Sequence, residues 1–450
     1  MPFARSGHAK PSPSAVNACA VVPVLALAYS TVIQPLIYFH FPPVPGLQGL
    51  METRTENRIF WPTLAAIAVL VAAKYWPRVG RLTLPPVIVA LLAYLAFAGT
   101  SIAWSFNPGL SLIRFAQELM VVTAIILPAM LAAREADIMR GVFLCFAFAA
   151  LVNVLMIPGG YYTFAKYGSE MVNIGYQGYF SGKNLMGECA AITLLLAIYE
   201  LRYPGYRRIL GIIVSAMAIV LLFASSSKTA LGLAVVAPVL AGLLLSIRRT
   251  FRVSPAIVMF STALICVLFC KLTGFDTGRI SYILTGDSSF TGRATIWFFA
   301  ETEIARSPFV GWGYQSFWLS GPDAPSVVNA PGWVKLMPNA HNGYYDTLLE
   351  LGYVGLVFLT IFLLTTLHVI GRVAERNSKR AWLLLSIALF IMLYNFLETL
   401  WLRAFDMSWV VFVIVAVEAA RHWHPAPLRV PPYGSRPLQS GWKPRFGART

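Results

Sequence analysis

The chain has 450 residues, of which 58% are hydrophobic and only 12% are charged. Soluble domains carry about 25% charged residues, so this composition excludes a water-soluble globular protein and indicates a protein embedded in a bilayer. The formal net charge of +16 does not indicate nucleic-acid binding, because the basic residues are spread between hydrophobic segments and no RNA-binding or zinc-finger motif is present. Their distribution is instead typical of the positive-inside rule for membrane proteins.

Twelve hydrophobic segments are long enough to span a membrane, since a bilayer core of ~30 Å takes ~20 helical residues. Segments such as 209–224 lack the alternation of a barrel strand, so helices are predicted. The expected spans are 16–39, 59–76, 84–104, 114–133, 138–157, 182–201, 208–225, 229–247, 254–272, 343–370, 382–401 and 405–421. The predicted fold class is an all-α polytopic membrane bundle with one long extramembrane loop that contains a short amphipathic helix. The 158–180 segment is treated as a loop rich in tyrosine.

The distribution of positive charge predicts the topology. With the N-terminus in the cytoplasm, about two thirds of the 35 Lys and Arg residues fall on the cytoplasmic side. An even number of spans returns the C-terminus to that side. We therefore expect four parts: an N-terminal bundle over 1–271, an outward-facing catalytic loop over 272–342, C-terminal membrane helices over 343–421, and a cytoplasmic tail over 422–450. The tail is rich in Pro and Arg, which predicts disorder.

Four basic residues lie on the outward side, at span ends or in the long loop: Arg114, Lys183, Lys228 and Arg293. Together they could surround one site, where fixed cations would suit a diphosphate, because charge-assisted hydrogen bonds to phosphate are short and strong. Snorkelling to lipid headgroups is the alternative for each of them. Lys228 is the most specific candidate, because it follows three serines in a short turn between two helices.

The long loop begins its ordered part with a predicted helix that Thr291 caps and Pro308 ends. Its apolar face predicts that it lies along the membrane surface. Arg293 falls in the first turn, where a cation opposes the helix dipole unless an anion binds beside it. Further on, Gly311 and Gly313 permit a tight turn that presents Trp312. The five apolar residues of the helix are Ile296, Trp297, Phe299, Ala300 and Ile304.

His341 is expected at the start of the tenth span, with Asn339 as the helix cap. An imidazole there can accept a proton at neutral pH, which suits a general base. The alternative is an ordinary interfacial histidine bonded to a carbonyl. If the helix includes His341, then Tyr345 lies on the same face.

Three carboxylates are further candidates. Asp346 and Glu350 follow His341 within a few helical turns. Glu188 falls inside the sixth span, and a carboxylate within a membrane is costly enough to indicate a function. Pairing with Lys183 or packing within the bundle is the alternative for Glu188.

Three blocks in order carry a family resemblance. They are Thr291-Gly-Arg293 followed by Ile296-Trp297, then Ser307-Pro-Phe-Val-Gly-Trp-Gly-Tyr-Gln-Ser-Phe317, then Ala340-His-Asn-Gly-Tyr-Tyr-Asp-Thr-Leu-Leu-Glu-Leu-Gly-Tyr-Val-Gly355. This set resembles the O-antigen ligase and polymerase superfamily of the Wzy/WaaL type. The Trp-Gly-Tyr-Gln-Ser-Phe and Ala-His-Asn-Gly-Tyr blocks look closest to exopolysaccharide polymerases of the ExoQ type.

The resemblance implies a metal-independent, inverting glycosyltransferase that needs no cofactor and lies in the bacterial inner membrane with its site on the periplasmic face. Its implied reaction polymerises undecaprenyl-diphosphate-linked oligosaccharide repeats into an exopolysaccharide. An O-antigen ligase that transfers the glycan to a lipid A core is one alternative, and a polysaccharide transporter or flippase is another. The expected partners are the lipid-linked oligosaccharide, membrane lipids, and chain-length regulator and export proteins, but no nucleic acid.

The resemblance and the residue pattern together imply roles for single residues. His341 and Arg293 are the expected catalytic residues. Lys228 departs from the family, because many relatives have Arg at this position; the charge is kept but the bidentate fork is lost. Lys183-Asn184 matches a basic-then-Asn segment of the family only loosely. The expected diphosphate ligands are Arg293, Lys228, Lys183 and Arg114, and the expected acceptor-glycan residues are Asn342, Tyr345 and Trp312.

Overall fold

The computed structural model describes residues 19–42, 54–75, 84–167, 170–274 and 292–423. Within these ranges each of the twelve predicted spans corresponds to a helix, and the all-α prediction is confirmed. The first span is a continuous helix made of α2 (Val21–Ala28), a π-helical turn η1 (Tyr29–Ile33) and α3 (Gln34–His40). The others are α5 (Thr55–Lys74), α7 (Pro86–Thr100), α8 (Pro108–Leu131), α9 (Ile138–Leu155), α10 (Lys183–Glu200), α11 (Tyr206–Ala224), α12 (Lys228–Phe251), α13 (Pro255–Thr273), α17 (Gly343–Val373), α18 (Ser378–Tyr394) and α19 (Met407–Arg421).

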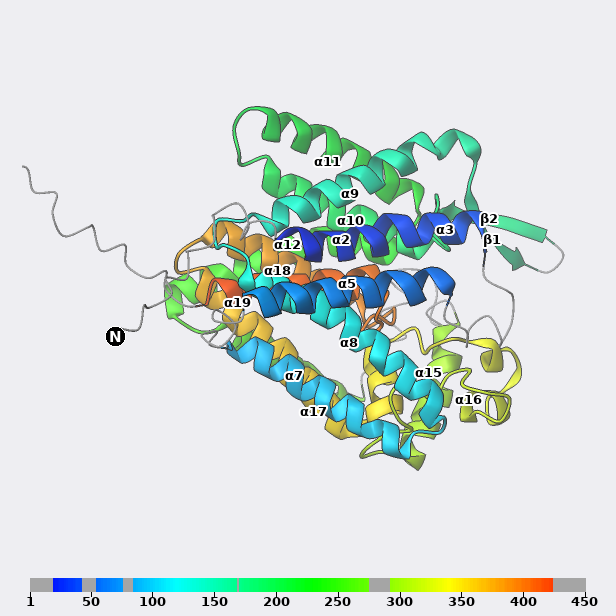
Figure 1. The fold of residues 1–450 in the computed structure, drawn as a ribbon. Coiled ribbons are helices and arrows are strands. Elements are labelled where there is room, and N and C mark those ends of the chain that lie inside the picture. Colours follow the sequence, from blue (N-terminus) through cyan, green and yellow to red (C-terminus); the bar gives the residue numbers. More distant parts are fainter. Residues whose placement is uncertain (1–18, 43–53, 76–83, 168–169, 275–291, 424–450) are drawn as a thin grey trace, which may run out of the picture.

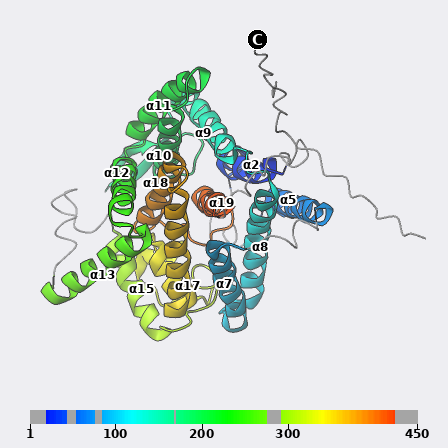
Figure 2. The same ribbon diagram turned by 90° about the vertical axis from the view of Figure 1, so that its left-hand side faces the viewer.

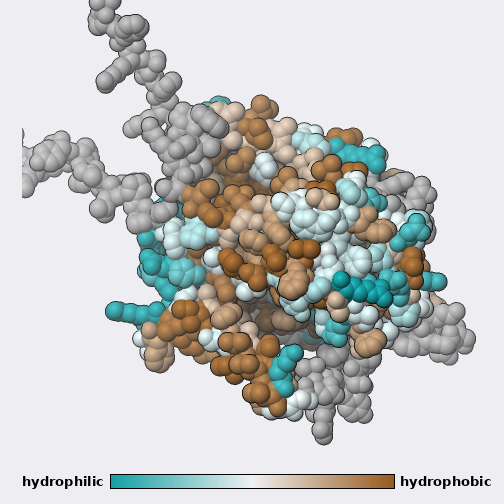
Figure 3. All heavy atoms as spheres, turned by 90° about the horizontal axis from the view of Figure 1, so that it is seen from below, coloured by the Kyte–Doolittle hydropathy of each residue, from teal (hydrophilic) through white to brown (hydrophobic). Residues whose placement is uncertain are grey.

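Nine helices of the described part are long and apolar enough to cross a membrane, so the chain is a multi-pass membrane protein. The helices at the other three predicted spans are too short or too charged to be counted with these nine. Helix α10 contains three charged residues, and α18 and α19 have only 17 and 15 residues. Hydrophobic side chains cover much of the face drawn in Figure 3, and most of the strongly hydrophilic ones lie toward its two ends.

Helix α19 forms the centre of the bundle. Every one of its 15 residues is buried, and α2, α7, α8, α17 and α18 surround it. Figure 2 looks along the bundle and shows α19 in the middle, with α13 at the edge. A helix that is hydrophobic on all sides is stable only when neighbours cover all sides, so protein surrounds this short helix where lipid surrounds the longer ones.

The helices alternate in direction, so every second connection between them lies at the same end of the bundle. The long loop lies at that end, at the right of Figure 1. A hairpin of β1 (Tyr162–Tyr167) and β2 (Glu170–Tyr176) lies there. The sequence analysis treated these residues as a loop and missed the two strands. The hairpin packs closely on the turn before α12, since a Cβ added at Gly175 would lie 2.2 Å from the Ser225 carbonyl oxygen.

The long loop folds around its own hydrophobic core. It contains α15 (Arg293–Arg306), α16 (Pro325–Val328) and the 3-10 turn η4 (Gly332–Leu336). The predicted apolar face of α15 is buried against Phe317, Trp318 and Leu349, so the expectation that it lies along the membrane surface is wrong. The N-cap residue is Gly292, without a side-chain cap bond, and the predicted cap Thr291 lies outside the described residues. Two further 3-10 turns, η2 (Ser101–Trp104) and η3 (Ile157–Gly159), lie at the same end of the bundle.

A break in α17 fixes the loop to the bundle. Gly352 has φ 64° and ψ −166°, which only glycine adopts without strain. The Tyr353 amide then donates to the Pro308 carbonyl at 2.8 Å, and the Trp312 amide donates to the Leu349 carbonyl at 2.8 Å. Gly311 is required for this contact, because a Cβ there would lie 2.5 Å from the Glu350 backbone. The two glycine positions explain why the loop can dock on the side of a helix.

Two helix ends differ from the predictions in ways that matter for the site. Helix α17 is capped by Asn342, whose side chain accepts hydrogen bonds from the Tyr344 and Tyr345 amides, so the prediction that Asn339 is the cap is wrong. Helix α18 ends at Tyr394, well before the predicted end at 401. The residues from 395 to 406 form a turn that returns the chain to α19 and carries Glu398 to the surface of α17.

Candidate active site

His341 lies directly before α17 in a left-handed conformation with φ 48°. It is therefore not part of the helix, and the predicted shared face with Tyr345 is wrong. The conformation is fixed on both sides: the Asn339 side-chain oxygen accepts from the His341 amide at 2.9 Å, and the Trp297 indole donates to the Ala340 carbonyl at 3.0 Å. Non-glycine residues held in this region cluster at functional sites, because the surrounding structure must stabilise the strain.

One carboxylate that the sequence analysis missed joins the two predicted catalytic residues. Glu398 Oε2 lies 3.2 Å from His341 Nδ1, and Glu398 Oε1 lies 2.8 Å from Arg293 Nη2. The Asn184 amide also donates to Glu398 Oε1, at 2.7 Å. We call these four residues the Glu398 cluster. They come from α10, α15, the end of the long loop and the α18–α19 turn, so four segments meet at this point.

The α18–α19 turn is positioned by contacts with the start of α17. The Gly343 amide donates to the carbonyls of Asn395 and Glu398, each at 2.9 Å. The Asn342 amide donates to Thr399 Oγ1 at 3.1 Å, and that hydroxyl donates to Asp346 at 2.6 Å. The same residues that begin α17 therefore hold the backbone of Glu398 beside His341.

The structure brings three of the four predicted diphosphate ligands together. Lys183 at the start of α10 interacts electrostatically with Lys228 and Arg293. Its ammonium group donates to the Ile174 carbonyl of β2 at 3.0 Å. Lys228 is the first residue of α12 and its side chain is exposed. Three cations from three elements thus interact with one another, and one of them, Arg293, contacts the Glu398 carboxylate.

Like Arg380 and Arg421, Arg293 has a buried donor that no described protein group satisfies. Its guanidinium group is mostly buried, with 15% of the side chain exposed, and only Nη2 contacts Glu398. The Nε atom is buried and has no hydrogen-bond partner within the described residues. A buried donor without a partner is rare in folded proteins and indicates a missing ligand or water.

Arg114 is not part of this group. One of its guanidinium nitrogens donates to the Gln315 carbonyl of the long loop, and its electrostatic neighbours are Arg403, Glu350 and Tyr314. The structure therefore places Arg114 in a different set of residues from Lys183, Lys228 and Arg293. The sequence placed Arg114 at the start of a span, whereas α8 begins at Pro108 and Arg114 lies in its second turn.

The three predicted acceptor-glycan residues make contacts within the protein. Asn342 caps α17. Trp312 packs in the core of the long loop, and its indole donates to the Glu303 carbonyl at 3.2 Å. The Tyr345 hydroxyl donates to Glu301 on α15. The Tyr345 ring packs against Trp297 with centroids 6.0 Å apart, and the Trp297 indole donates to the Ala340 carbonyl directly before His341.

The other predicted carboxylates are bonded to groups that the sequence analysis did not identify. Glu350 forms two contacts with Arg403, at 2.9 and 3.3 Å, and Asp346 lies 3.5 Å from the same guanidinium. Glu188 accepts a hydrogen bond from Ser408 of α19. Asp346 also accepts from the Ala340 amide at 3.1 Å. Asp346 and Glu350 therefore stabilise the segment that carries His341, and Glu188 stabilises the packing of α10 on α19.

Glu398 and Arg403 could have been found from the sequence. The predicted span 382–401 included Glu398 because the surrounding residues are mostly apolar. The rule that identified Glu188, that a carboxylate within a membrane segment indicates a function, applies equally to Glu398. It also argues against a continuous helix at that position.

Comparisons with known proteins agree with the predicted resemblance. Residues 212–360 match the O-antigen ligase family. The chain is 26% identical over 283 residues to a curated relative, "Exopolysaccharide production protein ExoQ" of Rhizobium meliloti (strain 1021). That alignment covers 61% of this chain and 63% of the relative. The matched range of this chain contains Lys228, Arg293 and His341, whereas Glu398 lies outside it.

The matched region begins within α11 and ends within α17, so it contains the whole described part of the long loop and both predicted catalytic residues. The order of its motifs, the twelve helices and the ExoQ relative point the same way. The predicted resemblance to the O-antigen ligase and polymerase superfamily, with ExoQ-type proteins as similar members, is thereby confirmed.

Proposed function

We propose that this protein polymerises undecaprenyl-diphosphate-linked oligosaccharide repeats into an exopolysaccharide at the periplasmic face of the inner membrane. The observation that carries the proposal is the state of Arg293, whose Nε donor is buried without a partner among the described residues. Lys183 and Lys228 are its neighbours. A diphosphate would supply an acceptor oxygen to the Arg293 Nε donor and negative charge to the three neighbouring cations.

In the proposed reaction an acceptor hydroxyl of one lipid-linked repeat attacks the anomeric carbon of another glycan. A carbon–oxygen bond forms on one face of the sugar while the bond to the diphosphate breaks on the other, which inverts the configuration. The hydroxyl proton passes to His341, and undecaprenyl diphosphate leaves. Arg293, Lys183 and Lys228 stabilise the charge that develops on this leaving group, a role that a divalent ion performs in other transferases.

Glu398 is proposed to position the base. It accepts a hydrogen bond from His341 Nδ1, at 3.2 Å, so Nε2 keeps its lone pair and can take the hydroxyl proton. The same carboxylate balances the imidazolium that forms. It also holds Arg293 when no donor is bound, and a bound diphosphate competes with it for that guanidinium.

A neighbouring cavity offers space for the first part of the lipid chain. It has a volume of about 630 Å³ and lies between the α2–α3 helix and the residues that lead into α10. Phe39, Phe180 and Leu185 contribute to its largely apolar wall. An isoprenoid chain in this cavity would run beside the start of α10, where Lys183 lies.

A ligase that transfers the glycan to a lipid A core is the second candidate, and the matched family is described as O-antigen ligase. Both reactions need the same donor site, so the acceptor decides between them. A deletion strain that accumulates single lipid-linked repeats indicates a polymerase. Accumulation of full-length lipid-linked polymer indicates a ligase. A transporter or flippase, the third candidate, would move the lipid-linked glycan without forming a glycosidic bond.

The test uses the purified full-length protein in lipid nanodiscs, supplied with a synthetic undecaprenyl-diphosphate repeat and no ATP, in the presence of a chelator. We expect a ladder of elongated lipid-linked products. If repeats are consumed by none of the preparations, whether or not divalent ions are added, the polymerase assignment is wrong. Elongation that needs an added divalent ion would contradict the metal-independent mechanism alone.

A further inference from the structure

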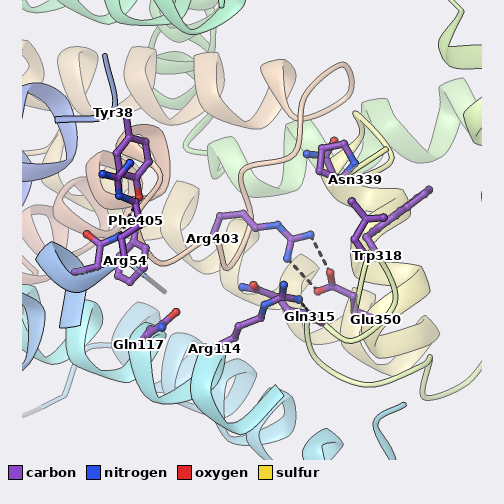
Figure 4. A pocket seen from close by; sticks show the side chains of 13 residues that line it. Tyr38, Arg54, Arg114, Gln117, Gln315, Trp318, Asn339, Glu350, Arg403 and Phe405 are labelled. Carbon is purple, nitrogen blue, oxygen red and sulfur yellow. Dashed lines mark hydrogen bonds and ion pairs between the residues drawn. The ribbon is translucent and has the colours of Figure 1, made fainter. Parts of the chain in front are cut away.

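A polar cavity of about 290 Å³ lies between the long loop and the helices α5 and α8. Side chains from α3, α17 and the α18–α19 turn complete its wall. We call it the loop cavity. Figure 4 shows Tyr38 and Phe405 at one side of it and Trp318 and Asn339 at the other. Its volume is close to the lower limit of ordinary small-molecule sites, which suits a single sugar ring.

The charges around the loop cavity balance one another. Three arginines line it, and each interacts with at least one carboxylate: Arg54 with Glu56, Arg403 with Glu350 and Asp346, and Arg114 with Glu350. Three positive charges are thus matched by three negative ones. A carboxylate from a ligand would compete with pairs that are already formed, so the loop cavity favours an uncharged ligand.

The Tyr38 hydroxyl offers this cavity a hydrogen-bond donor. Its oxygen accepts from the Gln34 side-chain amide at 3.0 Å and from the Asn57 side-chain amide at 3.1 Å. A phenol oxygen accepts two hydrogen bonds and donates one, so these contacts occupy its acceptor positions. The Asn57 amide is fixed in this orientation, because its oxygen accepts from the Tyr29 hydroxyl at 2.8 Å. The Tyr38 O–H is therefore left to donate to a ligand oxygen in the cavity that Tyr38 lines.

The Gln315 side chain offers the opposite kind of group. Its amide nitrogen donates to the Tyr314 hydroxyl at 2.8 Å and to the Leu402 carbonyl at 2.6 Å, so both N–H groups are used and the side-chain oxygen is left as an acceptor. Gln315 and Leu319, which both line the cavity, have left-handed backbones with φ 44° and 45°. Non-glycine residues are held in this conformation at a cost and cluster at functional sites.

A ring that carries several hydroxyls matches this wall. Each hydroxyl both donates and accepts, so one ligand can bond the Tyr38 proton and the Gln315 oxygen. Trp318 and Phe405 add aromatic surface to the wall, which can bury the apolar C–H face of a sugar ring. A donor, an acceptor, aromatic surface and balanced charge together indicate an uncharged sugar.

The loop cavity adjoins both parts of the proposed site. Asn339 lines it, and the Asn339 side-chain oxygen accepts from the His341 amide at 2.9 Å. Tyr38 and Phe405 also line the apolar cavity proposed for the lipid chain, so the two cavities lie side by side. Among the described residues of its wall, none is a cation proposed to bind the donor diphosphate. A sugar in the loop cavity therefore lies near the segment of the proposed base and outside the diphosphate site.

From this arrangement we infer that the loop cavity binds one uncharged sugar of the acceptor glycan. The inference rests on the proposed function, which supplies the acceptor. The Tyr38 hydroxyl donates to a sugar oxygen, and the Gln315 side-chain oxygen accepts from a sugar hydroxyl. The cavity thereby positions the acceptor glycan and disfavours a sugar that carries a carboxylate.

The test measures binding to the purified full-length protein by isothermal titration calorimetry. The probes are two neutral disaccharides, glucosyl-glucose and mannosyl-mannose, the acidic disaccharide glucuronosyl-glucose, and inorganic diphosphate. We expect at least one neutral disaccharide to bind, and the acidic one to bind more weakly than glucosyl-glucose. Tyr38→Phe should weaken binding of the neutral disaccharide by about 3–10-fold, the range for loss of one hydrogen bond between neutral groups, and leave diphosphate binding unchanged.

Tyr353→Phe is the matched control, because it makes the same substitution at an exposed tyrosine of α17 that lines neither cavity. It should leave binding of every probe unchanged. If Tyr38→Phe fails to fold, Gln315→Met replaces it, with a loss of the same size expected. The inference is overturned by no binding of either neutral disaccharide, or by an acidic disaccharide that binds as tightly as glucosyl-glucose. Unchanged disaccharide binding in the variant, or an equal loss of diphosphate binding, would also overturn it.

These measurements are independent of polymerisation. A protein that binds the neutral disaccharide through Tyr38 but does not elongate repeats would contradict the proposed function and retain the loop cavity as a sugar site. A protein that elongates repeats, and whose disaccharide binding does not respond to Tyr38→Phe or Gln315→Met, would retain the proposed function and overturn the inference.

Discussion

The Glu398 cluster and the Arg403 group, which is Arg403 with Glu350 and Asp346, balance their cations in different ways. In the Glu398 cluster, one carboxylate contacts both Arg293 and His341, and its side chain is 17% exposed. In the Arg403 group, the guanidinium contacts two carboxylates, Glu350 and Asp346, whose side chains are 6% and 2% exposed. One guanidinium thus shares its carboxylate with a histidine, and the other has two buried carboxylates.

This difference separates a group that can exchange its partner from one that cannot. In the proposed function a diphosphate replaces the Glu398 carboxylate on Arg293, and Glu398 keeps its hydrogen bonds with His341 and Asn184. Removing Glu350 or Asp346 from Arg403 would leave a buried charge without its partner, which costs about 3–5 kcal/mol. We therefore expect substitutions in the Glu398 cluster to affect activity and substitutions of Arg403 to affect stability.

The largest expected effect comes from the two predicted catalytic residues. Arg293→Ala and His341→Ala should each lower polymerisation by about 10²–10⁴-fold, the range for loss of an acid–base or charge-stabilising group, and so abolish long polymer. Polymer length is measured by gel electrophoresis of the extracted glycan. The amount of protein inserted in the membrane is measured alongside it.

Lys335→Ala is the matched control, because Lys335 is an exposed cation of the same loop. It should leave polymer length unchanged. Near-normal polymer in both Arg293→Ala and His341→Ala would show that the Glu398 cluster is not the site of chemistry.

The second effect concerns stability. Arg403→Ala should lower the free energy of unfolding by about 3–5 kcal/mol, because Glu350 and Asp346 lose the guanidinium that balances them. Arg293→Ala should cost much less, since its carboxylate partner is more exposed. The stabilities of both variants are compared by thermal unfolding in the same detergent. A smaller loss of stability in Arg403→Ala than in Arg293→Ala would contradict the distinction between the two groups.

The third effect tests whether Glu398 positions His341. Glu398→Gln keeps the size of the side chain but removes the charge that balances an imidazolium. We expect kcat to fall by about 10–100-fold, the equivalent of one hydrogen bond to a charged group. KM for the lipid-linked donor should stay the same or fall, because Arg293 no longer has a competing carboxylate. A rise in KM with unchanged kcat would indicate that Glu398 only maintains the shape of the donor site.

The sequence predicted the helices well because the thickness of a bilayer fixes the length of an apolar segment. It also singled out Arg293 and His341, since polar motifs stand out in a hydrophobic chain, and both residues contact Glu398. It could not predict that Glu398 bonds Arg293, because this contact joins residues 105 positions apart and no periodicity records it. Arg114 shows the same limit, because only the packing of the helices determines which side of α8 meets which neighbour.

The smallest effect comes from a third cation–carboxylate pair, which belongs to neither group. Arg306 contacts Glu303 at 2.7 Å within α15, and their side chains are 51% and 1% exposed. Burial raises the pKa of the Glu303 carboxyl above its ordinary value, and the nearby Arg306 opposes this shift only in part. A raised pKa means that the contribution of this group to stability is fully present below the pKa of the unfolded chain and is lost as pH rises through the folded pKa.

Glu303→Gln removes this titration while keeping a polar group of the same size. The melting temperature of the variant relative to the natural protein should therefore rise between pH 4 and pH 8, by about a few degrees at most. The ion-pair partner of Glu303, Arg306, is half exposed, whereas the partner of Glu350, Arg403, is mostly buried. A rise in the relative melting temperature with pH would show that the Glu303 carboxylate is buried at a cost in stability. A relative melting temperature that falls over the same pH range would mean that Arg306, though half exposed, stabilises the charged form of Glu303.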